Sequence, residues 1–184
     1  MMPNTKNYRS DTLLNAQRLL NDSKLLYEAE RNESAIILAV FALEEFGKYL
    51  IDCWGTKNAA NKRKYPSHTE KQAATFVVLH AREVIKASPK KFRSIMDGAD
   101  KRIRRWGPHS EQMQWAKAGF YDNLRMVATY TDQTPIWPEE ITGSLQDFEV
   151  KDLHKFFQKA LLASRDKKTM ELSATIYENG LGDL

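Results

Sequence analysis

The feature that most constrains the fold is a segment over residues 34–54 that would be apolar on almost every side as a helix. Ala35 to Leu43 is an unbroken run of nine apolar residues. A helix that is hydrophobic all round belongs in the middle of a bundle. Nine residues fall well short of the roughly 20 needed to span a bilayer. We therefore predict a buried central helix in a soluble, all-α protein.

The segments around this helix predict a helical bundle. An amphipathic helix over 11–31, with Ser10 or Asp11 as its N-cap, should form an antiparallel hairpin with it, and Gly55 should end the central helix. Further helices are predicted over 68–88, 90–106 and 110–130. A long C-terminal helix should begin near 146 and continue past Ser164, with a break at 165–168. We expect one domain over 1–184, of about five to six helices, with residues 1–10 and 179–184 frayed.

Composition narrows the class of protein. The chain has 184 residues, 42% of them hydrophobic and 28% charged, which is ordinary for a globular domain. A single cysteine, Cys53, excludes an internal disulfide and a four-cysteine zinc site. No leader segment and no glycine-rich phosphate loop are visible. We expect a cytoplasmic protein without membrane contact, cofactor or metal.

Charge is unevenly distributed along the chain. Residues 57–105 hold 14 Lys or Arg against four Asp or Glu, a net charge of +10 in a protein whose total is +4. Such a segment is typical of a surface that binds phosphate or an acidic partner, or of solvated helix faces. The candidate nucleic-acid-binding residues are Lys62, Arg63, Lys64, Arg102, Arg104 and Arg105.

Two carboxylates, Glu44 and Glu45, stand in the most apolar helix, followed by Gly47 and Lys48. Buried charges are costly unless they are paired or hydrogen-bonded. Glu44 and Lys48 are four residues apart and are predicted to form an intrahelical ion pair. Glu45 points about 100° away and needs another partner. Gly47 costs about 1 kcal/mol of helix propensity, which indicates that a neighbouring helix approaches closely there. The cluster is either structural or a working site.

Several pieces of the sequence resemble the AbiV abortive-infection family, a branch of the HEPN helical-bundle superfamily. They cover roughly residues 11–140 and come in the order of that family. These pieces are Asn15-Ala16-x-Arg18-Leu19-Leu20, Ala39-x-x-Ala42-Leu43-Glu44-Glu45-Phe46-Gly47-Lys48, Ser67-His68-x-x-Lys71, Ala116-Lys117 with Tyr121-Asp122, and Trp137-Pro138. The resemblance implies a bacterial anti-phage protein that forms a homodimer.

The resemblance also raises the question of ribonuclease activity. Catalytic HEPN proteins are metal-independent ribonucleases with an Arg and a His separated by four to six residues. The Arg would stabilise the charge on the phosphorane, and the His would move a proton. Arg63 with His68, and Arg104 or Arg102 with His109, have this spacing. None of these arginines is followed by the Asn, Asp or His that is frequent in the motif.

His68 is the histidine we favour as a site residue. It opens a predicted helix, and Lys71 lies one turn later, so both could contact Glu45. Tyr121 and Asp122 could hydrogen-bond to this cluster, although a core contact explains Tyr121 equally well. His154 is expected at the surface.

The leading functional hypothesis is a phage-defence protein that binds a phage or host component and interferes with translation or RNA. The alternative is a metal-independent endoribonuclease. The expected partners are a second copy of the chain, a phage protein and RNA.

Overall fold

The computed structural model describes residues 5–55, 66–87, 89–96, 109–129 and 150–180. These residues form eight α-helices and contain no β-strand, as the all-α prediction requires. The helices are α1 (Thr5–Glu28), α2 (Asn32–Trp54), α3 (His68–Ala87), α4 (Pro89–Met96), α6 (Ser110–Lys117), α7 (Phe120–Thr129), α9 (Val150–Ala163) and α10 (Lys167–Gly180).

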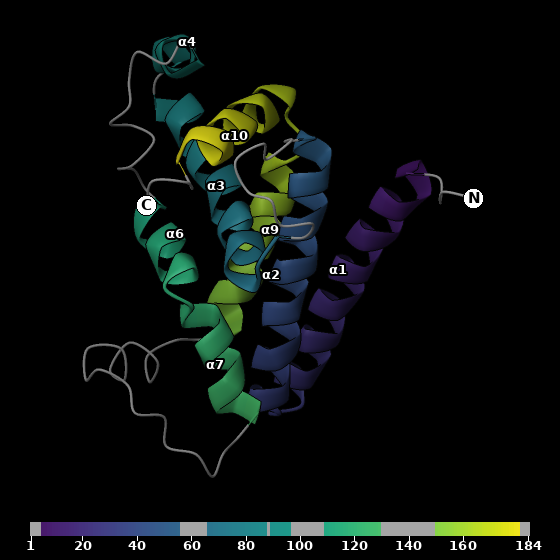
Figure 1. Ribbon diagram of the computed structural model, residues 1–184. Coiled ribbons are helices and arrows are strands. Elements are labelled where there is room, and N and C mark those ends of the chain that lie inside the picture. The colour runs from purple at the N-terminus through teal and green to yellow at the C-terminus, as the bar shows by residue number, and fades with distance from the viewer. Residues whose placement is uncertain (1–4, 56–65, 88, 97–108, 130–149, 181–184) are drawn as a thin grey trace.

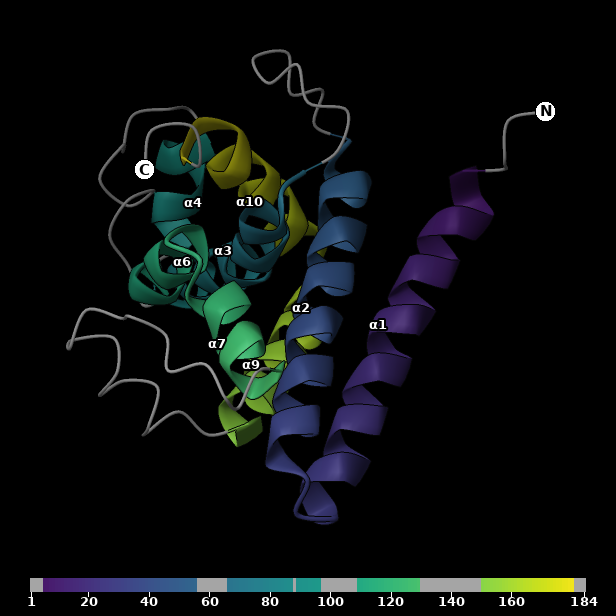
Figure 2. The ribbon, with the colours of Figure 1, turned by 60° about the horizontal axis from the view of Figure 1, so that its bottom comes forward.

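Helices α1 and α2 form the predicted antiparallel hairpin. Both views show them meeting at the connecting turn and diverging towards the other end, with α1 on the side of the molecule away from α6 (Figures 1 and 2). The turn closes α1 with two hydrogen bonds, from Arg31 N–H to Leu26 O at 2.9 Å and from Glu30 N–H to Tyr27 O at 3.0 Å. Glu30 has a positive φ of 59°. This is a Schellman ending with glutamate in the place usually held by glycine.

The start of α1 differs from the prediction. The helix already includes Ser10 and Asp11, which we expected as its N-cap, and it begins at Thr5. Residues 5–10 contain neither glycine nor proline, so the helix continues through them. Residues 5–10 belong to α1 and residues 179–180 to α10, and the fraying of the two chain ends stays a prediction. Residues 1–4 and 181–184 lie outside the described residues.

Helix α3 is more enclosed than the predicted central helix α2. Ten consecutive residues of α3, from Gln72 to Ala81, are buried. This helix contacts α2, α6, α9 and α10, whereas α2 keeps partly exposed positions along its length. Hydrophobicity on every face therefore identified a core helix but missed the most central one. Alanines and valines let the neighbours of α3 approach from all sides.

Two predicted long helices are each divided. Gly119, with a φ of +83°, separates α6 from α7 where one helix over 110–130 was expected. A positive φ is incompatible with a continuing right-handed helix. The C-terminal region forms α9 and α10, with the break at residues 164–166 close to the expected position. Gly55 ends α2 in the left-handed conformation, as predicted.

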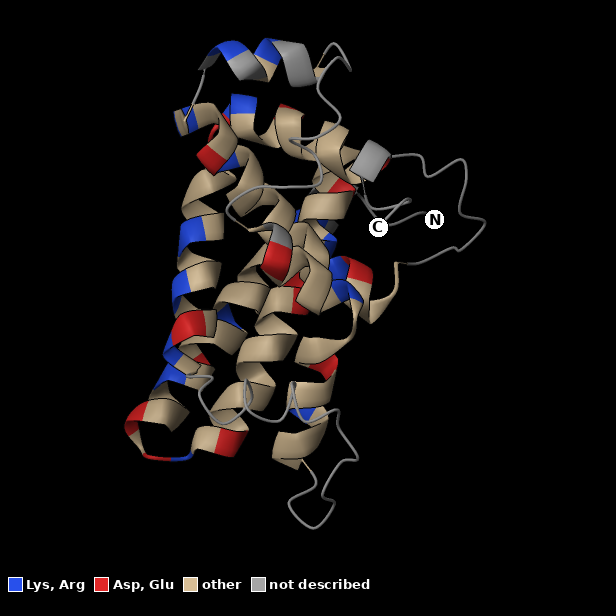
Figure 3. Ribbon diagram, turned by 90° about the vertical axis from the view of Figure 1, so that its left-hand side faces the viewer, with Lys and Arg blue, Asp and Glu red and all other residues tan. Residues whose placement is uncertain are grey.

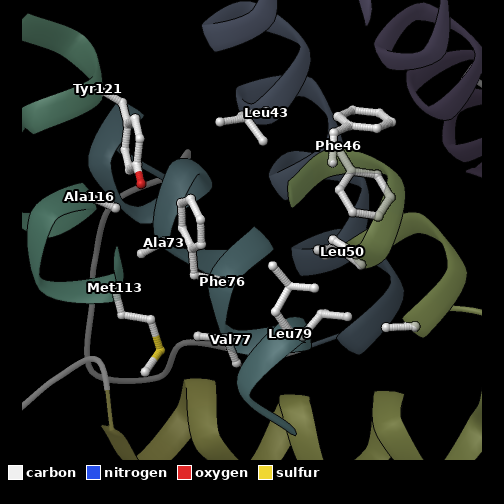
Figure 4. Packing of buried hydrophobic residues seen from close by; sticks show 14 of the residues in the cluster. Leu43, Phe46, Leu50, Ala73, Phe76, Val77, Leu79, Met113, Ala116 and Tyr121 are labelled. Carbon is white, nitrogen blue, oxygen red and sulfur yellow. The ribbon is translucent and has the colours of Figure 1, made fainter. Parts of the chain in front are cut away.

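The core is centred on α2 and α3, and α6, α7, α9 and α10 pack around them. The ring of Phe76 on α3 stacks on Tyr121 of α7, with 5.2 Å between centroids, and Phe46 of α2 contacts Phe157 of α9 at 5.0 Å. Figure 4 shows Phe46, Phe76 and Tyr121 together with Leu43, Leu50 and Met113. No helix in the described ranges is both long and apolar enough to cross a membrane.

Candidate functional site

The candidate site lies where the start of α3 crosses α2, and the closest approach is at Gly47. A Cβ atom on Gly47 would lie 1.7 Å from the carbonyl oxygen of Lys71. No side chain larger than hydrogen fits at this distance. The prediction that Gly47 admits a neighbouring helix is confirmed.

Polar contacts flank this crossing on one side. The Nδ1 atom of His68 lies 2.6 Å from Oε2 of Glu44, and the side-chain amide of Gln72 donates to Oε1 at 2.9 Å. One turn further along α3, the Thr75 hydroxyl donates to the main-chain oxygen of Leu43 at 3.3 Å. Both oxygens of the Glu44 carboxylate are therefore held by α3, which offsets the cost of burying the charge.

The two side chains of the His68–Glu44 pair differ sharply in solvent exposure. The side chain of Glu44 is only 7% exposed, whereas that of His68 is 60% exposed. Since Nδ1 of His68 is engaged by the carboxylate, its Nε2 atom remains for other contacts. A carboxylate bonded to one ring nitrogen fixes the tautomer and the orientation of an imidazole. The arrangement can hold or move a proton at the surface of the protein.

The N-terminus of α3 fixes the position of His68. The N–H of Ser67 donates to Oε2 of Glu70 at 2.6 Å, and the N–H of Glu70 donates to Oγ of Ser67 at 3.2 Å. This reciprocal pair is a capping box, and it satisfies two main-chain donors at the helix start. The sequence signal was present as Ser67-x-x-Glu70. Gln72 and Thr75, by contrast, carried no signal beyond their spacing from His68.

The prediction assigned the two carboxylates the wrong way round. Glu45, not Glu44, pairs with Lys48 at 3.8 Å, and the amide of Asn15 on α1 contacts Glu45 at 3.4 Å. Glu44 rather than Glu45 binds His68. The physical reason is the rotation of about 100° per residue, which turns Glu44 towards α3 and Glu45 towards α1. The side chain of Glu45 is 28% exposed and therefore needs a partner less.

Three further predicted members of the cluster have other roles in the structure. Lys71 contributes its main chain to the crossing, and in the described part of the chain its side chain forms no hydrogen bond with either carboxylate. Tyr121 is fully buried and stacks on Phe76, and burial raises its pKa. Asp122 binds Arg125 within α7 at 2.6 Å. Of the two interpretations of Tyr121, a core contact therefore fits its position better than a hydrogen bond to the cluster.

The other histidines occupy different environments. His109 precedes α6 and lines a pocket against the C-terminal half of α3, far along that helix from His68. Burial and the neighbouring His80 lower the pKa of His109. His154 is buried, contrary to the prediction of a surface residue, because its Nε2 atom contacts Ser23 Oγ at 2.8 Å.

Arg63, Arg102 and Arg104, the arginine partners predicted for His68 and His109, lie outside the described residues. Within the basic segment over 57–105, residues 57–65, 88 and 97–105 lie outside the described residues, and all six candidate nucleic-acid-binding residues fall in these gaps. These six residues are Lys62, Arg63, Lys64, Arg102, Arg104 and Arg105. On the described helices, basic and acidic residues are interspersed (Figure 3). In these ranges no group of three or more His, Cys, Asp or Glu could hold a metal ion.

Residues 4–155 match the AbiV family of HEPN domains. The chain belongs to the AbiV family. No curated protein and no solved structure matches it. The part that matches AbiV includes α1 to α7, the whole of the Glu44–His68 cluster and His109. The match ends within α9, and α10 lies beyond it.

Proposed function

We propose that this AbiV-family chain is a bacterial phage-defence protein that acts in abortive infection. It binds a phage or host component and thereby interferes with translation or RNA in the infected cell. Family membership supports the biological role. The contact between exposed His68 and buried Glu44 supports the place of action on the protein.

The burial of the Glu44 carboxylate also supports this site. A carboxylate with little exposure is costly in the core, and an apolar residue of similar size would often be as stable. Here the carboxylate holds an imidazole whose other face is open to solvent. A fixed, exposed hydrogen-bonding group beside a rigid helix crossing is suited to contacting a partner.

The test is phage challenge of bacteria that express the wild type, His68→Ala or a control. The matched control is Lys155→Ala, an exposed charged position on α9. We expect His68→Ala to lose protection while its soluble amount and melting temperature stay close to the wild type. Full protection by His68→Ala at normal abundance would contradict the proposed site.

A metal-independent endoribonuclease is the second candidate. The observation that favours it is the orientation of His68 by Glu44, because a tautomerically fixed imidazole is suited to acid–base chemistry. Purified protein incubated with total RNA in EDTA should then cleave it, and His68→Ala or His109→Ala should abolish cleavage. If the wild type protects cells but leaves RNA intact, the ribonuclease is contradicted and the binding mechanism remains.

A further inference from the structure

A pocket of about 510 Å³ opens between the C-terminal half of α3, the start of α6 and the end of α9. It is remote from the Glu44–His68 cluster, since Arg82 follows His68 by 14 residues, or about 21 Å of helix. A cavity of several hundred cubic ångströms is the size of a small-molecule site. The residues that line the pocket determine which ligand it would bind.

The charged part of the wall carries an excess of positive charge. Among the described lining residues it consists of Arg82, Lys86 and Lys159 against one acid, Glu83. Lys86 contacts Glu83 at 2.7 Å, and Arg82 contacts Asp166 at 3.3 Å. Both pairs are substantially exposed, so they are weak and open to competition from a stronger anion.

Lys159 is the cation best placed to bind an anion. Within the described ranges it forms no salt bridge or hydrogen bond with another residue. Arg82 adds a guanidinium with five N–H donors, of which the contact with Asp166 engages one nitrogen. A guanidinium together with two ammonium groups favours a doubly charged phosphate over a carboxylate.

The remaining wall is apolar or neutral. Leu79, Leu162 and Ala163 line the pocket, and Leu162 is 63% exposed. The His109 ring also lines it and meets the edge of Phe156 at 6.2 Å between centroids. Its lowered pKa keeps the imidazole neutral at pH 7, so it offers a hydrogen bond rather than a further charge.

We propose that this pocket binds a phosphomonoester with a compact hydrophobic body. The phosphate lies against Arg82, Lys86 and Lys159, and the body covers Leu79 and Leu162. The ligand is either a free phosphorylated small molecule or the terminal phosphate of an RNA strand. This site goes beyond the proposed function and does not depend on it.

Calorimetric titration of the purified full chain with phenyl phosphate tests the proposal. Inorganic phosphate should bind more weakly than phenyl phosphate, because it lacks the apolar body. Lys159→Gln should weaken phenyl phosphate binding about tenfold, the effect expected for one lost charge-assisted contact. Lys155→Gln is the matched control, since Lys155 lies one turn earlier on α9 and does not line the pocket. It should bind as the wild type does.

A second variant should change the affinity for phenyl phosphate in the opposite direction. Glu83→Gln removes the acid that the described lining residues present to the pocket and should tighten binding of phenyl phosphate. Failure of the wild type to bind phenyl phosphate at about 1 mM, the weak end of measurable affinities, would overturn the proposal. Equal losses in Lys159→Gln and Lys155→Gln would overturn it as well.

Two short RNA strands that differ only in a 5′-phosphate distinguish the sources. Tighter binding of the phosphorylated strand than of both the unphosphorylated strand and phenyl phosphate, lost in Lys159→Gln, assigns the site to an RNA end. Tighter binding of phenyl phosphate assigns it to a small molecule. Both outcomes support the shared phosphate chemistry. None of these measurements involves phage protection, so they succeed or fail separately from the proposed function.

Discussion

The carbonyl oxygen of Lys71 occupies the space that a Cβ atom on Gly47 would need, at 1.7 Å from its ideal position. The obstructing atom belongs to the main chain of α3, so it cannot move aside by changing a rotamer. The contact between α2 and α3 therefore depends on this one glycine. The same crossing places Glu44 within reach of His68 and Gln72.

Gly47→Ala should destabilise the protein although alanine favours helices. The gain in helix propensity is about 1 kcal/mol, whereas forcing two helix backbones apart in a packed core costs typically 1–3 kcal/mol or more. We expect a net loss of stability in urea denaturation. Gln158→Ala, at an exposed helical position on α9, is the control and should be nearly neutral. A Gly47→Ala protein as stable as the wild type would show that the helices do not approach this closely.

Glu44→Ala should destabilise the protein more than Glu45→Ala. Removing Glu44 leaves the buried amide of Gln72 without its acceptor, which costs about 1–3 kcal/mol. Glu45 is partly exposed and its ion pair with Lys48 spans 3.8 Å, so its loss should cost less than about 1 kcal/mol. Urea denaturation of both variants measures the difference. The reverse order of stabilities would contradict the assignment of Glu44 as the buried partner.

The sequence identified Gly47 and His68 at the helix crossing, but it missed Gln72 and Thr75 and did not identify which carboxylate binds His68. A glycine followed by a lysine in an apolar helix indicated close approach, and His68 was expected at the start of the next helix. Which of two adjacent carboxylates faces that helix depends on the rotation of α2 about its axis. That rotation is set by the packing of all neighbouring helices together, which periodicity within one helix does not contain.

The break between α6 and α7 is a second feature that depends on tertiary packing more than on the local sequence. Gly119 was readable as a possible helix break, but a single glycine inside a helical pattern is also tolerated. Its positive φ arises in the folded chain, where α6 and α7 pack against different partners, α3 and α2. Similarly, the burial of His154 depends on Ser23, 131 residues earlier in the chain. Local sequence patterns do not report such distant contacts.

Stability should decrease as the pH falls below about 6.5. Burial, with a smaller contribution from Lys24, lowers the pKa of His154 in the folded protein. In the window between that lowered value and the ordinary value near 6.5, the unfolded chain binds a proton that the folded chain does not. Stability is therefore full above this window and is lost as the pH falls through it. His109 has the same sign, since its pKa is also lowered by burial.

The control for this pH dependence is His154→Gln, which keeps a hydrogen-bonding side chain near Ser23 but does not titrate. Melting temperatures of both proteins between pH 7.5 and 5.5 measure the effect. The wild type should lose more stability over this range than the variant does. Identical pH profiles would mean that His154 does not contribute.

The basic segment should determine any affinity for RNA. Each lysine or arginine that contacts a phosphate releases a counterion, so binding should weaken steeply with salt. Reversing Lys62, Arg63 and Lys64 to Glu should reduce RNA binding much more than it changes the melting temperature. Filter-binding titrations at several salt concentrations measure this. Unchanged affinity in the triple variant would assign these charges to a solvated surface.

We expect the protein to form a two-fold homodimer in solution. On α1, Leu14 and Leu25 are 59% and 63% exposed, and they are 11 residues apart, about three helical turns, so they share one face. This helix lies at the side of the molecule and packs mainly against α2, which leaves its outer face uncovered (Figure 2). Apolar side chains aligned on such a face are typical of an interface between subunits.

Changing Leu14 and Leu25 together to Glu should convert the dimer to a folded monomer, because two charges would be buried without partners in the interface. Both positions are exposed in the single chain, so the double variant should keep its helical content. Light scattering at tens of micromolar measures the mass, and circular dichroism measures the fold. Leu162→Glu, an equally exposed position on α9, is the matched control and should remain dimeric. A monomeric wild type would contradict the homodimer, and a dimeric double variant would exclude this face of α1 as the interface.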